Sequence, residues 1–220
     1  MPAPNPNPTF KFKNLFAIQL HYSFTILIIM KILLTLFVLL LSSSVLAEDI
    51  SDFQIEGMSI GDSLLNYYSE EIISNSEIQY FENERQYYVV GIYNNLKTYD
   101  AVEIYLRTND KNYEIKTIAG KLIIENKKQC LRMKDKLTAD IAFLFKNKKQ
   151  HDDTKNPEYD NSGESKQYIS QFNIDGWLTH VRVECALYSK KIKKDRGYED
   201  TLNVVAMDEE ISEWIFDGYR

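Results

Sequence analysis

Residues 168–187 read "YISQFNIDGWLTHVRVECAL" and predict an antiparallel β-hairpin. Apolar and polar residues alternate on both sides of Asp175-Gly176, which is the period of strands with one buried face. Asp-Gly suits the two-residue type I′ turn, so we expect the chain to reverse at this pair. The residues expected to share one face of the second strand are Trp177, Thr179, Val181, Val183, Cys185 and Leu187. His180 falls on the opposite face, where we expect an exposed imidazole.

Further strands and three helices are predicted on both sides of this hairpin. The runs 87–93, 101–107 and 113–125 are rich in β-formers or alternate in polarity, and a short strand is expected at 202–207. Helices are predicted from the N-cap residues Ser59, Asn126 and Asp208. The order α-βββ-α-βββ-α favours an α+β fold, with an antiparallel sheet packed by helices and a C-terminal helix. Residues 48–220 then form a single domain, whose halves 59–124 and 126–207 leave open a tandem α-βββ repeat.

The central helix carries one half of a predicted disulfide. We expect this helix to end at about Lys146, and its apolar stripe consists of Cys130, Met133, Leu137, Ile141 and Leu144. Cys130 and Cys185 are the two cysteines of the chain, and both point toward one core. An oxidising compartment would join them in a disulfide, and two buried free thiols are the alternative.

Two polar segments are predicted to be loops. Residues 147–167 form a long polar linker with His151, Asp152, Asp153, Glu158, Asp160 and Glu164. Oxygen-rich loops can hold Ca²⁺, but the D-x-D-x-D-G spacing is absent, so we expect a solvated loop and no metal site. The segment "KKIKKDR" (190–196) is the dense positive patch, expected in a loop that is solvated or contacts an acidic partner or lipid head groups.

The first 47 residues have the pattern of an export signal. They contain Lys11, Lys13 and Lys31 but no acidic residue, and residues 30–47 read "MKILLTLFVLLLSSSVLA". A charged start, an apolar run and a small-residue end predict a signal peptide cleaved after Ala47. Residues 1–29 then either precede the true start codon, which would be that of Met30, or form a disordered, apolar leader. The alternative to cleavage is an uncleaved membrane anchor within 16–47.

The charge of the exported part limits its partners. All 32 acidic residues follow residue 47, so this part is more negative than the −6 of the whole chain. Such a protein is poorly suited to nucleic acids or anionic surfaces. We expect a protein or envelope partner, with membrane contact only through an uncleaved N-terminal segment.

Residues 57–64, "GMSIGDSL", contain two hydrolase signatures, G-x-S-x-G around Ser59 and G-D-S-L around Ser63. A G-x-S-x-G serine needs a preceding buried strand, and only residues 48–58 lie between the predicted cleavage site and Ser59. For Ser63, by resemblance to the G-D-S-L hydrolases, neither His151 nor His180 has an Asp three residues before it. We therefore expect helix capping by Ser59 and Asp62 rather than catalysis, with a Ser63 hydrolase kept as the alternative.

The segment 54–75, "QIEGMSIGDSLLNYYSEEIISN", resembles small exported proteins of unknown function from AT-rich bacteria. Gly57-Met58-Ser59 followed by the α-βββ order also resembles the BamE-like module of outer-membrane assembly proteins. Together with the signal peptide, these features predict a periplasmic or secreted protein that is a non-enzymatic binding or interaction protein. We expect no catalytic residues, cofactor or metal; the alternative location is the inner membrane, held by the N-terminal segment.

Overall fold

The computed structural model describes residues 49–80 and 86–217, which belong to one compact unit, Leu46–Arg220. The predictions for 1–29 and 30–47 lie outside the described residues. Within the described part, no helix is both long and apolar enough to cross a membrane.

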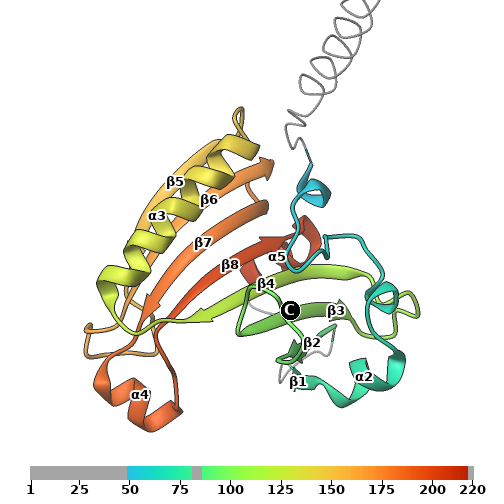
Figure 1. Ribbon diagram of the computed structural model, residues 1–220, viewed down its shortest axis with the longest axis horizontal. Coiled ribbons are helices and arrows are strands. Elements are labelled where there is room, and N and C mark those ends of the chain that lie inside the picture. Colours follow the sequence, from blue (N-terminus) through green and yellow to red (C-terminus); the bar gives the residue numbers. More distant parts are fainter. Residues whose placement is uncertain (1–48, 81–85, 218–220) are drawn as a thin grey trace, which may run out of the picture. The chain divides into compact units, whose positions relative to one another are not determined.

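The described residues form an α+β fold around one eight-stranded antiparallel sheet, which confirms the predicted fold class. The strands are β1 (Glu77–Tyr80), β2 (Tyr87–Ile92), β3 (Ala101–Arg107), β4 (Ile115–Ile123), β5 (Lys149–Lys155), β6 (Lys166–Asp175), β7 (Thr179–Leu187) and β8 (Thr201–Met207). They lie in the order β1-β2-β3-β4-β8-β7-β6-β5. The sheet therefore consists of two four-stranded meanders joined where β4 pairs with β8 (Figure 1).

Two hydrophobic cores lie on opposite faces of the sheet, as the alternation along β8 requires. Val204 and Ala206 belong to the larger core, together with the segment 50–73 and helix α3 (Lys127–Leu144). Val205 and Met207 belong to the smaller core under helix α5 (Glu209–Phe216). Figure 1 shows α3 lying along the β5–β8 half of the sheet.

The side chains of β5 and β6 that point away from α3, together with Arg182 of β7, form a surface that we call the open face. All seven residues of β5 are exposed, and Gln171 and Asn173 of β6 are half-buried. Within the described part of the chain, α5 covers β2, β4 and β8 on this side but leaves β5 and β6 uncovered.

Helix α3 begins after Asn126, whose side chain accepts a hydrogen bond from Gln129 N, as predicted. It ends at Leu144, close to the expected boundary. Cys130 on this helix and Cys185 on β7 form a disulfide, with their Cα atoms 5.8 Å apart, and this confirms the predicted pair. The bond ties α3 to strand β7.

The expected helix from Ser59 is wrong. Ile55 and Met58 instead form an isolated bridge, and Gly57 and Gly61 have φ angles of 83° and 85°, which a right-handed helix does not allow. The segment 49–75 contains the short 3₁₀ turns η2 (Ile50–Asp52) and η3 (Leu64–Asn66) and helix α2 (Glu70–Asn75). Asp62 Oδ2 does accept from Ser59 N at 2.9 Å, so the expected reach-back bond closes a turn instead of a helix.

The polar linker predicted at 147–167 is also wrong in part, because residues 149–155 form strand β5. Its sequence, "KQHDDTK", has no apolar alternation, since every side chain of this edge strand is exposed. Backbone pairing with β6 from Lys149–Asn173 to Lys155–Gln167 holds it in place. Charged side chains on an edge strand also disfavour pairing with other chains.

The basic segment 190–196 is a helix, α4 (Lys190–Arg196), and not the predicted loop. Ser189 accepts a hydrogen bond from Ile192 N, and Gly197 ends the helix in the left-handed conformation, with φ 68°. Each half of the chain contributes four strands rather than three, because β1 and β5 were not expected. The tandem repeat over 59–124 and 126–207 stays a prediction.

Candidate functional site

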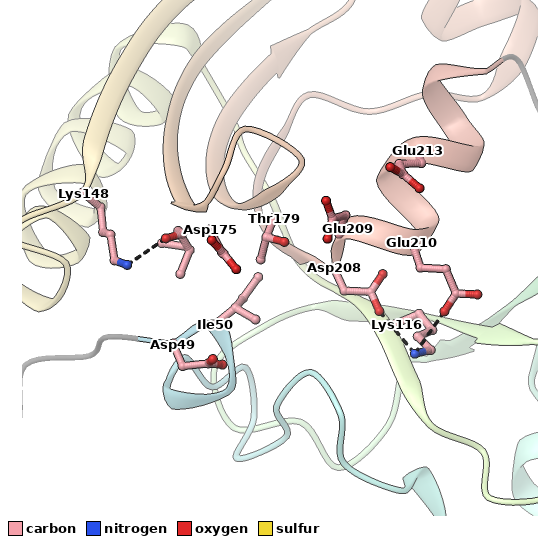
Figure 2. A pocket seen from close by; sticks show the side chains of 11 residues that line it. Asp49, Ile50, Lys116, Lys148, Asp175, Thr179, Asp208, Glu209, Glu210 and Glu213 are labelled. Carbon is pink, nitrogen blue, oxygen red and sulfur yellow. Dashed lines mark hydrogen bonds and ion pairs between the residues drawn. The ribbon is translucent and has the colours of Figure 1, made fainter.

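An acidic pocket lies where the β6–β7 hairpin, η2 and the start of α5 meet (Figure 2). Its volume is about 700 Å³. The carboxylates that line it are Asp49, Asp175, Asp208, Glu209, Glu210 and Glu213, and the lysines are Lys116 and Lys148. The lining is therefore negative overall.

Both lysines already have partners within the protein. Lys148 Nζ donates to the carbonyl of Ile174 at 2.7 Å. Lys116 Nζ lies 2.8 Å from Glu114, 3.4 Å from Asp208 and 3.3 Å from Glu210. Burial acts to lower the pKa of Lys116, but these carboxylates raise it well above its ordinary value.

The first carboxylate of α5 has a structural role in this pocket. Asp208 caps α5 by accepting from Ile211 N at 3.0 Å, and its burial raises the pKa of the carboxyl group. Lys116 thus links strand β4 to the start of α5. Across the described residues, no group of three or more His, Cys, Asp or Glu side chains is arranged to hold a metal ion.

A second hollow, which we call the Trp177 groove, lies on the open face. It has a volume of about 290 Å³. The groove is lined by His151, Asp152, Asp153, Lys155, Ile169, Gln171, Trp177 and Arg182. Strand pairing explains why three of them meet, because His151, Gln171 and Arg182 occupy one row across β5, β6 and β7.

The tip of the β6–β7 hairpin separates the two hollows. Asp175 pairs directly with Thr179, so the loop has three residues, 176–178, and the expected two-residue turn at Asp175-Gly176 is wrong. A register irregularity between Asn173 and Asp175 accompanies this loop. Trp177 consequently leaves the buried face of β7 predicted for it and is 60% exposed.

The structure does not bring a base to either serine of the hydrolase signatures. Ser59 is buried beside Asp62, and Ser63 Oγ donates to the carbonyl of Asn112 at 2.5 Å. Ser63 forms an isolated bridge with Glu114, ahead of β4. The hydrolase alternative at Ser63 stays a prediction, and no contact among the described residues supports it.

His180 is buried, and the expected exposed imidazole is wrong. The residue is 6% exposed, and Nδ1 lies 2.8 Å from the carbonyl of Leu178. Desolvation lowers the pKa of His180 to about 4. The face opposite α3 is covered at this point because α5 packs against β7, which the alternation of the strand alone does not reveal.

The carboxylates of 151–164 serve different local partners. Asp160 accepts from Ser162 N at 3.0 Å and from Ser165 N at 3.1 Å within its own loop. Asp152 accepts from the Ser170 hydroxyl, and this hydrogen bond lowers the pKa of its carboxyl group.

A buried series of hydrogen bonds between α3, β6 and β5 was not predicted from the sequence. Lys134 Nζ donates to Ser170 Oγ at 2.6 Å, and Ser170 donates in turn to Asp152. The signal lies in the spacing, because position 134 is one turn after Cys130 and on the buried side of the helix. Ser170 is fully buried, so we interpret these hydrogen bonds as satisfying the buried ammonium group of Lys134.

Comparison with known proteins adds no relative: no family model, curated protein or solved structure matches the chain.

Proposed function

We propose that this protein is a non-enzymatic binding protein, exported to the periplasm or cell envelope, and that it holds its partner on the open face. The observation that carries the proposal is the Trp177 groove. It combines an exposed aromatic ring with polar side chains on the neighbouring strands β5, β6 and β7. A few placed polar groups beside an aromatic surface are typical of binding sites.

Two features support export. Residues 30–47 have the signal-peptide pattern, and the Cys130–Cys185 disulfide suits an oxidising compartment. A disulfide between helix and sheet would help the protein to remain folded outside the cytoplasm.

The proposal is tested by expressing the full chain in a bacterial host that has a periplasm and separating the cell fractions. We expect the mature protein to begin at Glu48 and to leave the cytoplasm. Recovery of the uncleaved chain in the cytoplasm would contradict export. A mature protein that retains residues 16–47 in the membrane fraction would instead support the anchored alternative.

Binding is tested with the exported protein and an envelope fraction from the same cells. Wild type should sediment with the envelope, whereas a Trp177→Ala, Arg182→Ala double variant should stay in solution. Tyr93→Ala is the matched control, because Tyr93 is also an exposed aromatic residue but lies at the end of β2. If the double variant sedimented as much as the wild type, the open face would be excluded as the binding surface.

The enzymatic alternative is tested with a fluorophosphonate probe. We expect no labelling of the wild-type protein. Labelling that disappears in Ser63→Ala would overturn the non-enzymatic proposal.

A further inference from the structure

The exposed aromatic pair at the Trp177 groove is a feature that the core does not require. Trp177 is 60% exposed and Phe216 at the end of α5 is 74% exposed. Their ring centroids lie 6.3 Å apart with the planes at 89°, an edge-to-face contact. Phe216 therefore supports the Trp177 ring while much of both rings stays in water.

The groove beside this ring offers hydrogen-bonding groups that the described residues leave unused. Gln171 donates through Nε2 to Asn173 at 3.0 Å, so its side-chain oxygen is available. Arg182 pairs through Nε with Glu184 at 3.5 Å, and its terminal nitrogens form no hydrogen bond or ion pair with residues 49–80 and 86–217. His151 on the edge strand likewise has an exposed ring in this part of the chain.

The charge of the lining selects a neutral ligand. Each cation of the groove has a carboxylate partner, because Lys155 lies 3.6 Å from Asp153 and Arg182 lies 3.5 Å from Glu184. The acidic pocket on the other side of the hairpin tip has six carboxylates and two lysines, and it would favour a cation. The groove favours neither sign of charge, which disfavours an anionic lipid or a strongly basic peptide as its ligand.

The composition of the groove also separates a carbohydrate from an apolar protein anchor. Protein interfaces place aromatic or aliphatic anchors in pockets whose centre excludes water. Here six of the eight lining residues are polar or charged, and Ile169 and Trp177 are the other two. A volume of about 290 Å³ lies just below the roughly 300–1,000 Å³ typical of small-molecule sites, so the groove suits one or two sugar rings.

We propose that the Trp177 groove binds a neutral oligosaccharide, a ligand class that rests on the proposed binding function. One apolar C–H face of a sugar ring would stack on Trp177. Its hydroxyl groups would accept from Arg182 and donate to the Gln171 oxygen, with His151 at the outer edge. Planar polar side chains suit sugars because neighbouring hydroxyls can contact both of their polar atoms.

Trp177 is also the reporter for a direct test. The chain has two tryptophans, and Trp214 is 4% exposed in the core under α5. In a Trp214→Phe variant, fluorescence therefore reports on Trp177 alone, and acrylamide quenches an exposed indole. The probes are maltohexaose, cellohexaose and the hexamer of N-acetylglucosamine, each titrated to millimolar concentration.

We expect at least one of these sugars to lower the quenching constant of Trp177 by about twofold or more, because a stacked sugar covers the ring. Calorimetry of the same sugar should show no binding to Trp177→Ala. Gln171→Ala should bind about tenfold more weakly, as expected for the loss of one hydrogen bond. Tyr93→Ala should bind like the wild type.

Failure of all three sugars to protect Trp177 would overturn the carbohydrate ligand, as would unchanged binding by Trp177→Ala. Protection by a neutral Gly-Ser peptide in place of the sugars would also overturn it. If the sugars fail while envelope sedimentation still depends on Trp177 and Arg182, the proposed binding function stands without the carbohydrate. If the wild-type protein did not sediment with the envelope, the proposed binding function itself would be contradicted.

Discussion

Single residues on β7 show how burial changes chemistry within a few positions. Arg182 is on the open face and contributes to a groove, whereas His180, two residues earlier on the same side of the strand, is enclosed. Burial disfavours the charged form of an imidazole, and this is the largest cause of its lowered pKa. His180 is therefore neutral in the folded protein under most conditions.

His180 should make the folded state sensitive to acid. Its pKa falls from 6.5 to about 4 on folding, so between these values the unfolded state binds more protons. The stability contributed by neutral His180 is present above pH 6.5 and is lost as the pH falls toward 4. The expected loss is about 3 kcal/mol in the free energy of unfolding.

Urea unfolding at a series of pH values measures this effect. Carboxylates also destabilise the protein in acid, so the informative quantity is the difference between wild type and His180→Gln. The variant should lose less stability than the wild type between about pH 7 and pH 4. Identical slopes for wild type and His180→Gln would contradict the assignment.

Among the elements, α5 is linked to the sheet by a lysine as well as by its packing. Lys116 on β4 contacts both Asp208, which caps the helix, and Glu210 in its first turn. The helix is short, and it covers the smaller core by packing Trp214 against Tyr87, with the two ring centroids 4.9 Å apart. Short helices gain most of their stability from such packing and from their caps.

Lys116→Ala should loosen α5 and lower the free energy of unfolding by about 1–2 kcal/mol, because neighbouring carboxylates lose their shared cation. In a Trp177→Phe background, Trp214 fluorescence should report the loosening through a shift toward longer wavelength. Lys121→Ala is the control, since it removes a more exposed pair with Glu103 on the same sheet. An unchanged Trp214 spectrum in Lys116→Ala would show that packing alone fixes the helix.

Elements differ in how much of their structure local sequence could predict. β3, β7 and α3 have clear periodicity because each has one buried side, and they were predicted within a few residues. β5 has no buried face, so no alternation indicates it, and backbone bonds to β6 define it. The turn at Ser59 was predicted as a helix because its serine and aspartate are also typical of a helix start.

Across the whole molecule, the Cys130–Cys185 bond joins helix α3 to strand β7 of the second meander. The cysteines are 55 residues apart in sequence, and both are fully buried. Such a bond restricts the unfolded chain more than the folded one. We therefore expect the bond to stabilise the folded protein.

Replacing both cysteines by alanine should lower the free energy of unfolding by about 4 kcal/mol, the loss expected for a loop of this length. The measurement is urea unfolding with and without a reducing agent. Reduction should destabilise the wild type and leave the Cys130→Ala, Cys185→Ala variant unchanged. A wild type that is equally stable in both conditions would show that the bond adds nothing to the folded state.

The sequence by itself determined the α+β class, the hairpin, the central helix and the cysteine pair, because periodic burial leaves a local pattern. The acidic pocket and the Trp177 groove combine residues from distant strands and helices, and pairing registers bring them together. Tertiary structure alone also decided that His180 is enclosed and Trp177 exposed, since the position of α5 and a three-residue loop set both. Local periodicity reports which face of a strand is covered only when a single layer does the covering, and here helices cover both faces unevenly.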